Sequence, residues 1–155
     1  MFEFGPWYLA AALVFAVASV WLSLVDVREQ RLPNKILWPA TGLIFVLLSC
    51  QALFDFKFDR LLGAVLAGSV SFVVYAVMRF ISPSSIGFGD VKLSVSIGLM
   101  LGWQAWQDVA LAALFGFVLG AVFAAVALAT KKASLKSHIA FGPFMLAGAW
   151  LMMFI

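Results

Sequence analysis

Two aspartates, Asp26 and Asp90, have the residue type and position needed for chemistry. Each adjoins a long hydrophobic stretch, whereas the other acidic residues fall at a terminus or between stretches. Ionisable groups close to a membrane interior are costly, which makes them functional candidates. Two carboxyl groups brought together tend to share one proton, so one can activate water while the other donates to a carbonyl. The pair therefore predicts aspartic protease chemistry, with no metal and no cofactor.

The surroundings of each aspartate also allow a structural interpretation. Gly87 and Gly89 precede Asp90 at alternate positions, where glycine permits unusual backbone conformations and leaves room for another chain. Asp90 could instead be a helix N-cap, and Asp26 could pair with an arginine of the loop that follows it. If both are catalytic, the positive helix N-terminus at Asp90 favours a base, and the negative C-terminus at Asp26 favours a proton donor.

Other catalytic sets find less support in the sequence. The single cysteine, Cys50, excludes a disulfide within the chain and a multi-cysteine zinc site. The only histidine, His138, is expected on the opposite side of the membrane from Cys50, which argues against a Cys–His dyad.

The elements that position the aspartates are predicted to be membrane helices. The 155 residues are 65% hydrophobic and 11% charged, with a mean hydropathy of +1.11, whereas soluble domains carry about 25% charged residues. A membrane-spanning helix needs about 20 apolar residues. We therefore predict an all-α, polytopic membrane protein of about six transmembrane helices that forms a single domain over residues 1–155. The predicted spans are 7–25, 36–54, 61–81, 90–106, 109–130 and 139–155.

The basic residues predict the orientation, because lysine and arginine concentrate in cytoplasmic loops. If the first, third and fifth loops are cytoplasmic, only Lys57 and Arg60 lie on the other side. Both termini are then outside, and Asp26 and Asp90 lie near the cytoplasmic face. The net charge of +3 thus fits a lipid bilayer as partner and not nucleic acid. The remaining basic residues are Arg28, Arg31, Lys35, Arg79, Lys92, Lys131, Lys132 and Lys136.

Small residues recur within the predicted spans. Gly63, Gly68, Gly116 and Gly120 are spaced so that they suit close helix contacts, on which association in lipid depends.

Around both aspartates the sequence resembles the prepilin peptidases, or type IV leader peptidases. Asp26 stands five residues before the triplet Leu-Pro-Asn (32–34), as in the first signature of that family. Residues 87–93, Gly-Phe-Gly-Asp-Val-Lys-Leu, resemble its second signature, the Gly-x-Gly-Asp motif of intramembrane aspartyl proteases. Residues 141–144, Phe-Gly-Pro-Phe, resemble a third family stretch. The likeness covers essentially the whole chain.

The resemblance implies that Asp26 and Asp90 are catalytic in cleaving the leader of type IV prepilins or pseudopilins. The implied substrate has a basic leader, a glycine at the cleavage point and then an apolar helix. The implied location is the cytoplasmic membrane of a prokaryote. Longer family members carry a cytoplasmic domain with paired cysteines that is associated with N-methylation. Because this chain has no Cys-x-x-Cys, the resemblance implies the short form, a peptidase without methyltransferase activity.

Residues near the aspartates have expected supporting roles. Pro33 and Asn34 should shape the start of the second span, because proline fits the first turn of a helix. Lys92 should lie on a different helix face from Asp90 and extend to the headgroups, with tuning of the aspartates as the alternative. Residues 142–143, Gly-Pro, should break one helix and start another.

Other functions remain open at this stage. A non-enzymatic membrane subunit, or a small proton- or cation-coupled transporter, could also use Asp26 and Asp90. Transporters place such acids near the bilayer midplane, whereas both are expected at one edge. A protease of the signal-peptide-peptidase or presenilin kind would have its first aspartate in a Tyr-Asp pair, and here Val25 precedes it. The oligomeric state and the pilus, secretion or competence system are also open.

Overall fold

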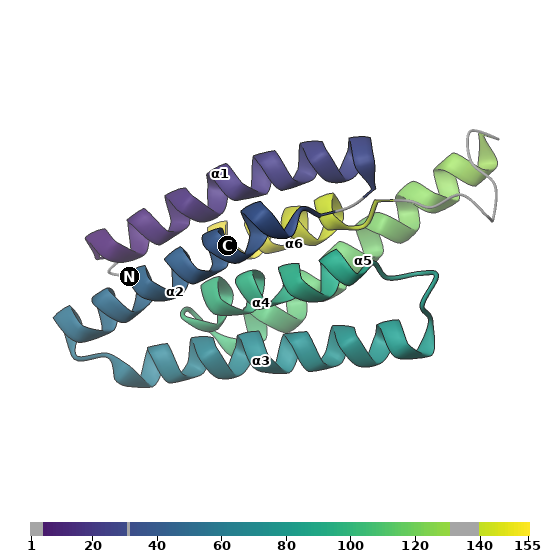
Figure 1. The fold of residues 1–155 in the computed structure, drawn as a ribbon. Helices are drawn as coiled ribbons and strands as arrows, with labels where there is room; N and C mark the ends of the chain where they lie inside the picture. The colour runs from purple at the N-terminus through teal and green to yellow at the C-terminus, as the bar shows by residue number, and fades with distance from the viewer. Residues whose placement is uncertain (1–4, 31, 131–139) are drawn as a thin grey trace.

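The structure, a computed structural model, describes residues 5–30, 32–130 and 140–155 and is built of α-helices (Figure 1). Four of the helices are long and apolar enough to cross a membrane, which confirms the prediction of an all-α polytopic membrane protein. No strand occurs in these three ranges. The helices are α1 (Pro6–Glu29), α2 (Asn34–Asp55), α3 (Phe58–Ile81), α4 (Phe88–Gly102), α5 (Trp106–Ala129) and α6 (Gly142–Phe154). Arg31, Lys131, Lys132, Lys136 and His138 lie outside the described residues.

The fourth helix is shorter than predicted and the fifth begins earlier. α4 ends at Gly102, and the amides of Gln104 and Ala105 both donate to the Leu101 carbonyl, which closes the last turn. The break was expected at the polar residues that precede 109, but Asp108 lies in the first turn of α5. An acidic side chain is favourable there because it faces the positive end of the helix dipole.

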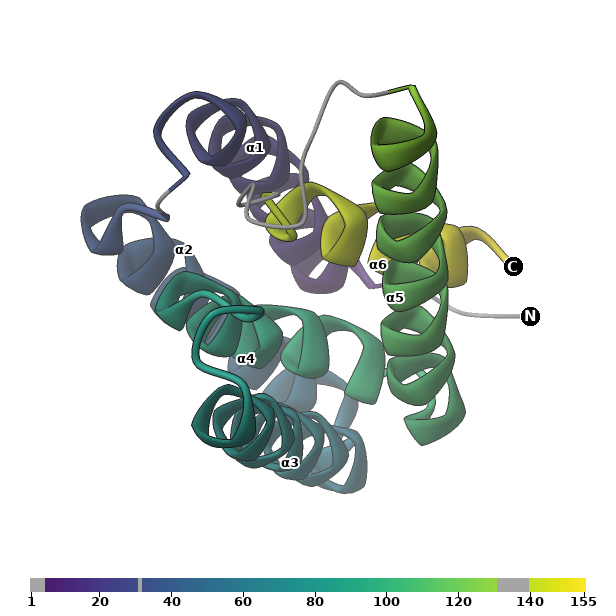
Figure 2. The same cartoon turned by 90° about the vertical axis from the view of Figure 1, so that its right-hand side faces the viewer.

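The central helix of the bundle is α4, which contacts each of the other five (Figure 2). Its residues from Ser96 to Gly102 are all buried. α5 lies at the edge beside α6, and the residues it buries are Ala112, Gly116 and Gly120. A helix with neighbours on all sides needs small side chains, and α4 has serines and glycines at its contacts.

The glycines of the spans lie at helix contacts, as predicted. A Cβ atom on Gly68 would lie 3.2 Å from the Val95 carbonyl oxygen of α4, and one on Gly116 would lie 3.2 Å from the Cα of Met145 in α6. Gly63 faces the Gly102 carbonyl at the same distance, and Gly120 faces the Phe141 ring. Close backbone approach therefore holds α3 to α4 and α5 to α6.

Candidate active site

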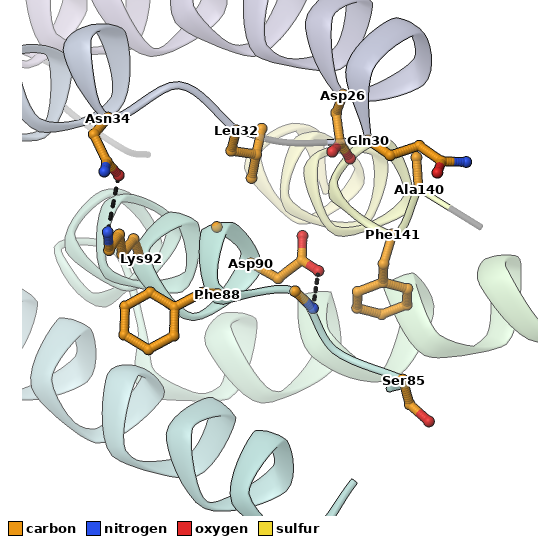
Figure 3. A pocket seen from close by; sticks show the side chains of 12 residues that line it. Asp26, Gln30, Leu32, Asn34, Ser85, Phe88, Asp90, Lys92, Ala140 and Phe141 are labelled. Atoms are coloured by element: carbon orange, nitrogen blue, oxygen red, sulfur yellow. Dashed lines mark hydrogen bonds between the residues drawn. The ribbon is translucent and has the colours of Figure 1, made fainter. Parts of the chain in front are cut away.

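A cavity of about 350 Å³ lies at one end of the bundle (Figure 3). The end of α1, the α1–α2 connection, the start of α4 and the segment before α6 all contribute to its wall. Of the predicted site residues, all but Pro33 line it. The lining residues are Asp26, Gln30, Leu32, Asn34, Ser85, Gly87, Phe88, Gly89, Asp90, Lys92, Ala140 and Phe141.

Asp26 lies in the last turn of α1 and is 5% exposed. Its Oδ2 accepts a hydrogen bond from the backbone N–H of Gly142, the first residue of α6, at 3.1 Å. The first N–H groups of a helix have no partner within it and carry its positive partial charge. The carboxyl is therefore held by the N-terminus of α6, although it lies near the C-terminus of its own helix.

This contact corrects the argument from helix polarity. The sequence suggested that Asp26 faces only a negative helix end, but packing brings a positive one to it. Helix ends thus favour the carboxylate at Asp26 as well as at Asp90, and polarity does not separate their roles.

Asp90 is the third residue of α4 and is 6% exposed. Its Oδ2 accepts a hydrogen bond from the Gly87 N–H at 3.0 Å, an arrangement found in capping boxes. The alternative of Asp90 as the N-cap residue is therefore wrong: Gly87 is the N-cap of α4, and Asp90 lies three positions after it. That bond occupies Oδ2 of Asp90 and thereby fixes the direction of Oδ1.

The side chains of Asp26 and Asp90 enter the cavity from opposite walls (Figure 3). A Cβ atom on Gly142 would lie 2.7 Å from Asp26 Oδ2 and 3.6 Å from Asp90 Oδ1. The two oxygens are therefore no farther apart than the sum of these distances, and the side chains interact electrostatically. The structure brings the predicted pair together, from separate helices.

The glycines of the Gly-x-Gly-Asp motif provide space rather than unusual backbone angles. Among the described residues no glycine has a positive φ. A Cβ on Gly87 would lie 3.1 Å from Asp90 Oδ2, and one on Gly89 would lie 2.6 Å from the Cβ of Leu32. One glycine therefore admits the carboxylate, and the other admits the α1–α2 connection.

Lys92 makes contacts that the sequence did not predict. Its ammonium lines the cavity, donates a hydrogen bond to Asn34 Oδ1 at 2.9 Å and lies 4.8 Å from the centre of the Phe88 ring. The reason is that the start of α2 packs beside the start of α4 and places an amide oxygen within its reach. Pro33 is the N-cap residue of α2, one position earlier than expected, and its carbonyl accepts the amides of Ile36 and Leu37.

Two contributors were missed at the sequence level. Residues 142–143 begin α6 as predicted, but nothing local indicates that the Gly142 amide points at Asp26. Arg79, near the end of α3, donates from Nη1 to the Ile86 carbonyl at 2.6 Å, and its guanidinium lies 5.2 Å from the centre of the Phe88 ring. Arg79 thereby holds the loop that leads to Gly87. Only its place eleven residues before Asp90 hinted at this.

The arrangement offers two carboxyl groups in one cavity, whose wall is made of both polar and apolar residues. Among the described residues no group of three or more His, Cys, Asp or Glu side chains could hold a metal ion. The two aspartates are themselves capable of acid–base chemistry.

Comparison with known proteins agrees with the motifs. Residues 13–130 match the type IV leader peptidase family. The relative named prepilin leader peptidase/N-methyltransferase of Stutzerimonas stutzeri is 31% identical over 96% of this chain and 51% of its own length. Relatives of the same name from Escherichia coli (30% identical, 96% and 64%) and Bacillus subtilis (27% identical, 92% and 54%) are similar. This chain thus spans about half to two thirds of these relatives. No solved structure matches it significantly.

Proposed function

This chain belongs to the type IV leader peptidase family, and from that premise we propose that it cleaves the leader of type IV prepilin-like or pseudopilin precursors. Asp26 and Asp90 are its aspartic dyad. The observation that carries the proposal is their convergence: both carboxyl groups are buried, and both border the same glycine at the start of α6.

The proposed reaction is general acid–base hydrolysis. The ionised carboxylate takes a proton from a water molecule, whose oxygen attacks the carbonyl carbon of the scissile bond. The protonated carboxyl donates to the carbonyl oxygen as negative charge develops there. Collapse of the tetrahedral intermediate breaks the C–N bond, and the leaving amine receives a proton from the dyad. Because the two groups are electrostatically coupled, the single proton belongs to the pair.

The backbone amides of Gly87 and Gly142 hold the pair in place. Each donates to one oxygen of one aspartate, which leaves the side chains little freedom to rotate. Such preorganisation lowers the cost of reaching the transition state, because the groups need not reorient during the reaction.

The position of the cavity suits a substrate that is half in lipid. Residues from the end of α1 and from the start of α4 line the cavity, and these two helix ends lie at the same end of the bundle (Figure 1). A substrate whose apolar helix stays in the bilayer could present the extended segment before that helix, with its basic leader in water. The distribution of lysine and arginine supports the cytoplasmic face of the inner membrane for this end. An edge position also favours a peptidase over a transporter.

We also propose that this chain cleaves without methylating the product. The support is that Cys50 is its single cysteine. The paired cysteines associated with methylation therefore have no counterpart within it.

The test uses the purified full chain in detergent with a prepilin peptide that has a basic leader, a glycine and an apolar helix. We expect one cut, after the glycine, and no gain of a methyl group on the product when a methyl donor is added. Asp26→Asn and Asp90→Asn should each abolish the cut. Asp59→Asn, which changes an exposed carboxyl in the first turn of α3, is the matched control. Normal cleavage by either dyad variant would refute the mechanism.

A further inference from the structure

The two signature regions touch each other directly, at a place next to the dyad. The N-terminal end of α4 is contacted at two points, by Leu32 from the α1–α2 connection and by Asn34, the first residue of α2. The first is the contact of Leu32 with Gly89, where a Cβ on the glycine would be 2.6 Å from that of the leucine. The second is the hydrogen bond from Lys92 Nζ to Asn34 Oδ1, at 2.9 Å (Figure 3).

Each side of this contact is close in sequence to one aspartate. Asp26 lies in the last turn of α1, and its carbonyl accepts the amide of Gln30, where the connection begins. Asp90 lies between Gly89 and Lys92 in α4. A shift of the connection along α4 would therefore change the separation of the two carboxyl groups.

The residues at the contact are suited to holding it. Leu32 is 9% exposed, so its side chain is removed from water on the surface that Gly89 leaves open. The Lys92 ammonium lies over the Phe88 ring, 4.8 Å from its centre. A cation over an aromatic face is attracted by it, so the ring and the Asn34 amide together keep the lysine at this position.

We propose that this contact sets the spacing of the dyad, with Asn34 and Lys92 as positioning residues and with Gly89 and Leu32 as the steric stop. The proposal rests on the proposed peptidase function. In this proposal, the bond from Lys92 to Asn34 holds the start of α4 against the start of α2. Asn34 and Lys92 do not touch the reacting atoms in this role. They act through the position of Asp90 relative to Asp26.

The spacing governs the titration of the dyad as well as its rate. The repulsion between two ionised carboxylates falls with distance, so the two apparent pKa values of the pair move closer together as the groups separate. Among the described residues, the charged groups that act on Asp90 are Asp26 from α1 and Arg79 from α3. Lys92, on the same helix as Asp90, bonds to Asn34. Arg79 is left unchanged in the test below, so its contribution is constant.

The test compares Asn34→Ala, Lys92→Met and the double variant in the cleavage assay. We expect each single variant to lose roughly 10- to 100-fold in kcat, as misplacement of catalytic groups does, with KM nearly unchanged. The double variant should be no worse than the poorer single variant, because both changes remove one bond. Asn34→Asp, which keeps an oxygen for the lysine, should restore kcat. Lys35→Met, at the exposed neighbouring lysine, is the control for loss of positive charge.

The pH profile separates positioning from a general loss of stability. In Asn34→Ala the acid and alkaline limbs of the kcat profile should move toward each other, whereas a merely less stable protein would keep the same limbs at lower amplitude. A second pair tests the steric stop independently. Gly89→Ala should lower kcat. The double variant Gly89→Ala/Leu32→Gly should recover part of that loss, because removing the Leu32 side chain makes room for the added methyl group.

The outcomes distinguish this proposal from the one on which it rests. Suppose that the wild type cleaves normally. The positioning role alone would then be overturned by any of four results: additive losses of kcat in the double variant, a change in KM alone, unchanged activity, or unmoved limbs of the pH profile. A change confined to KM would place Lys92 against the substrate. If the wild type fails to cleave, or Asp90→Asn cleaves normally, the peptidase function itself is wrong.

Discussion

The amide of Gly142 donates a hydrogen bond to the carboxylate of Asp26, across 116 positions of sequence. This bond places the start of the last helix between the two aspartates. The close approach of both aspartates also explains why residue 142 is a glycine, because a side chain there would meet both carboxyl groups.

Gly142→Ala is expected to abolish the proposed cleavage without unfolding the protein. The added Cβ would lie 2.7 Å from Asp26 Oδ2, which is too close, so the carboxylate must move. A displacement of this size should cost about 100-fold or more in kcat. Gly42→Ala is the matched control, because nothing lies within 4 Å of its Cβ position and alanine favours a helix. Wild-type kcat in folded Gly142→Ala would contradict the assigned geometry.

Cleavage should pass through a maximum as pH is varied. At low pH both carboxyl groups of Asp26 and Asp90 are protonated and no base remains, so the rate falls. At high pH the shared proton is lost and no acid remains, so the rate falls again. The measurement is kcat between about pH 4 and pH 9, with thermal unfolding recorded at each pH as the control. A rate that rises steadily to the highest pH would be inconsistent with the dyad.

Gly98→Ala should destabilise the fold. A Cβ at this position would lie 2.6 Å from the Cα of Gly68 and 2.8 Å from the carbonyl oxygen of Ala67. These are backbone atoms and cannot rotate away, so α3 and α4 must separate. Overpacking of this kind costs about 1–3 kcal/mol. Thermal unfolding in detergent measures it, and an unfolding temperature equal to that of the wild type would show that the helices are not packed this closely.

Gln51→Leu should also destabilise the protein, while leaving cleavage by the folded fraction unchanged. The side chain of Gln51 is 2% exposed, and its Oε1 accepts the backbone amides of Trp7 and Tyr8 at the start of α1. A buried amide left without a partner costs about 1–3 kcal/mol. Ser49→Ala, at an exposed hydroxyl of the same helix that bonds only within it, is the control. A loss of kcat at low temperature would reveal coupling between this end of α1 and the dyad.

Much of the fold was readable because it depends on local properties. The length and hydropathy of each stretch predicted the helices, and the small residues predicted their contacts. The boundary between α4 and α5 was placed too late, because a polar residue such as Asp108 is equally at home in a loop or in a first helical turn. The bond of Lys92 to Asn34 was not predicted, because Asn34 belongs to another helix.

What the sequence determined by itself is the class of protein, the two aspartates and the motifs around them, because hydropathy and motif spacing are properties of short segments. The tertiary structure alone decided how the aspartates are held: the α6 amide at Asp26, the Leu32 contact at Gly89 and the Lys92 bond to Asn34. Each of these joins residues that are far apart in the sequence. Their geometry depends on how closely glycine-lined surfaces pack, and that is a property of the assembled bundle.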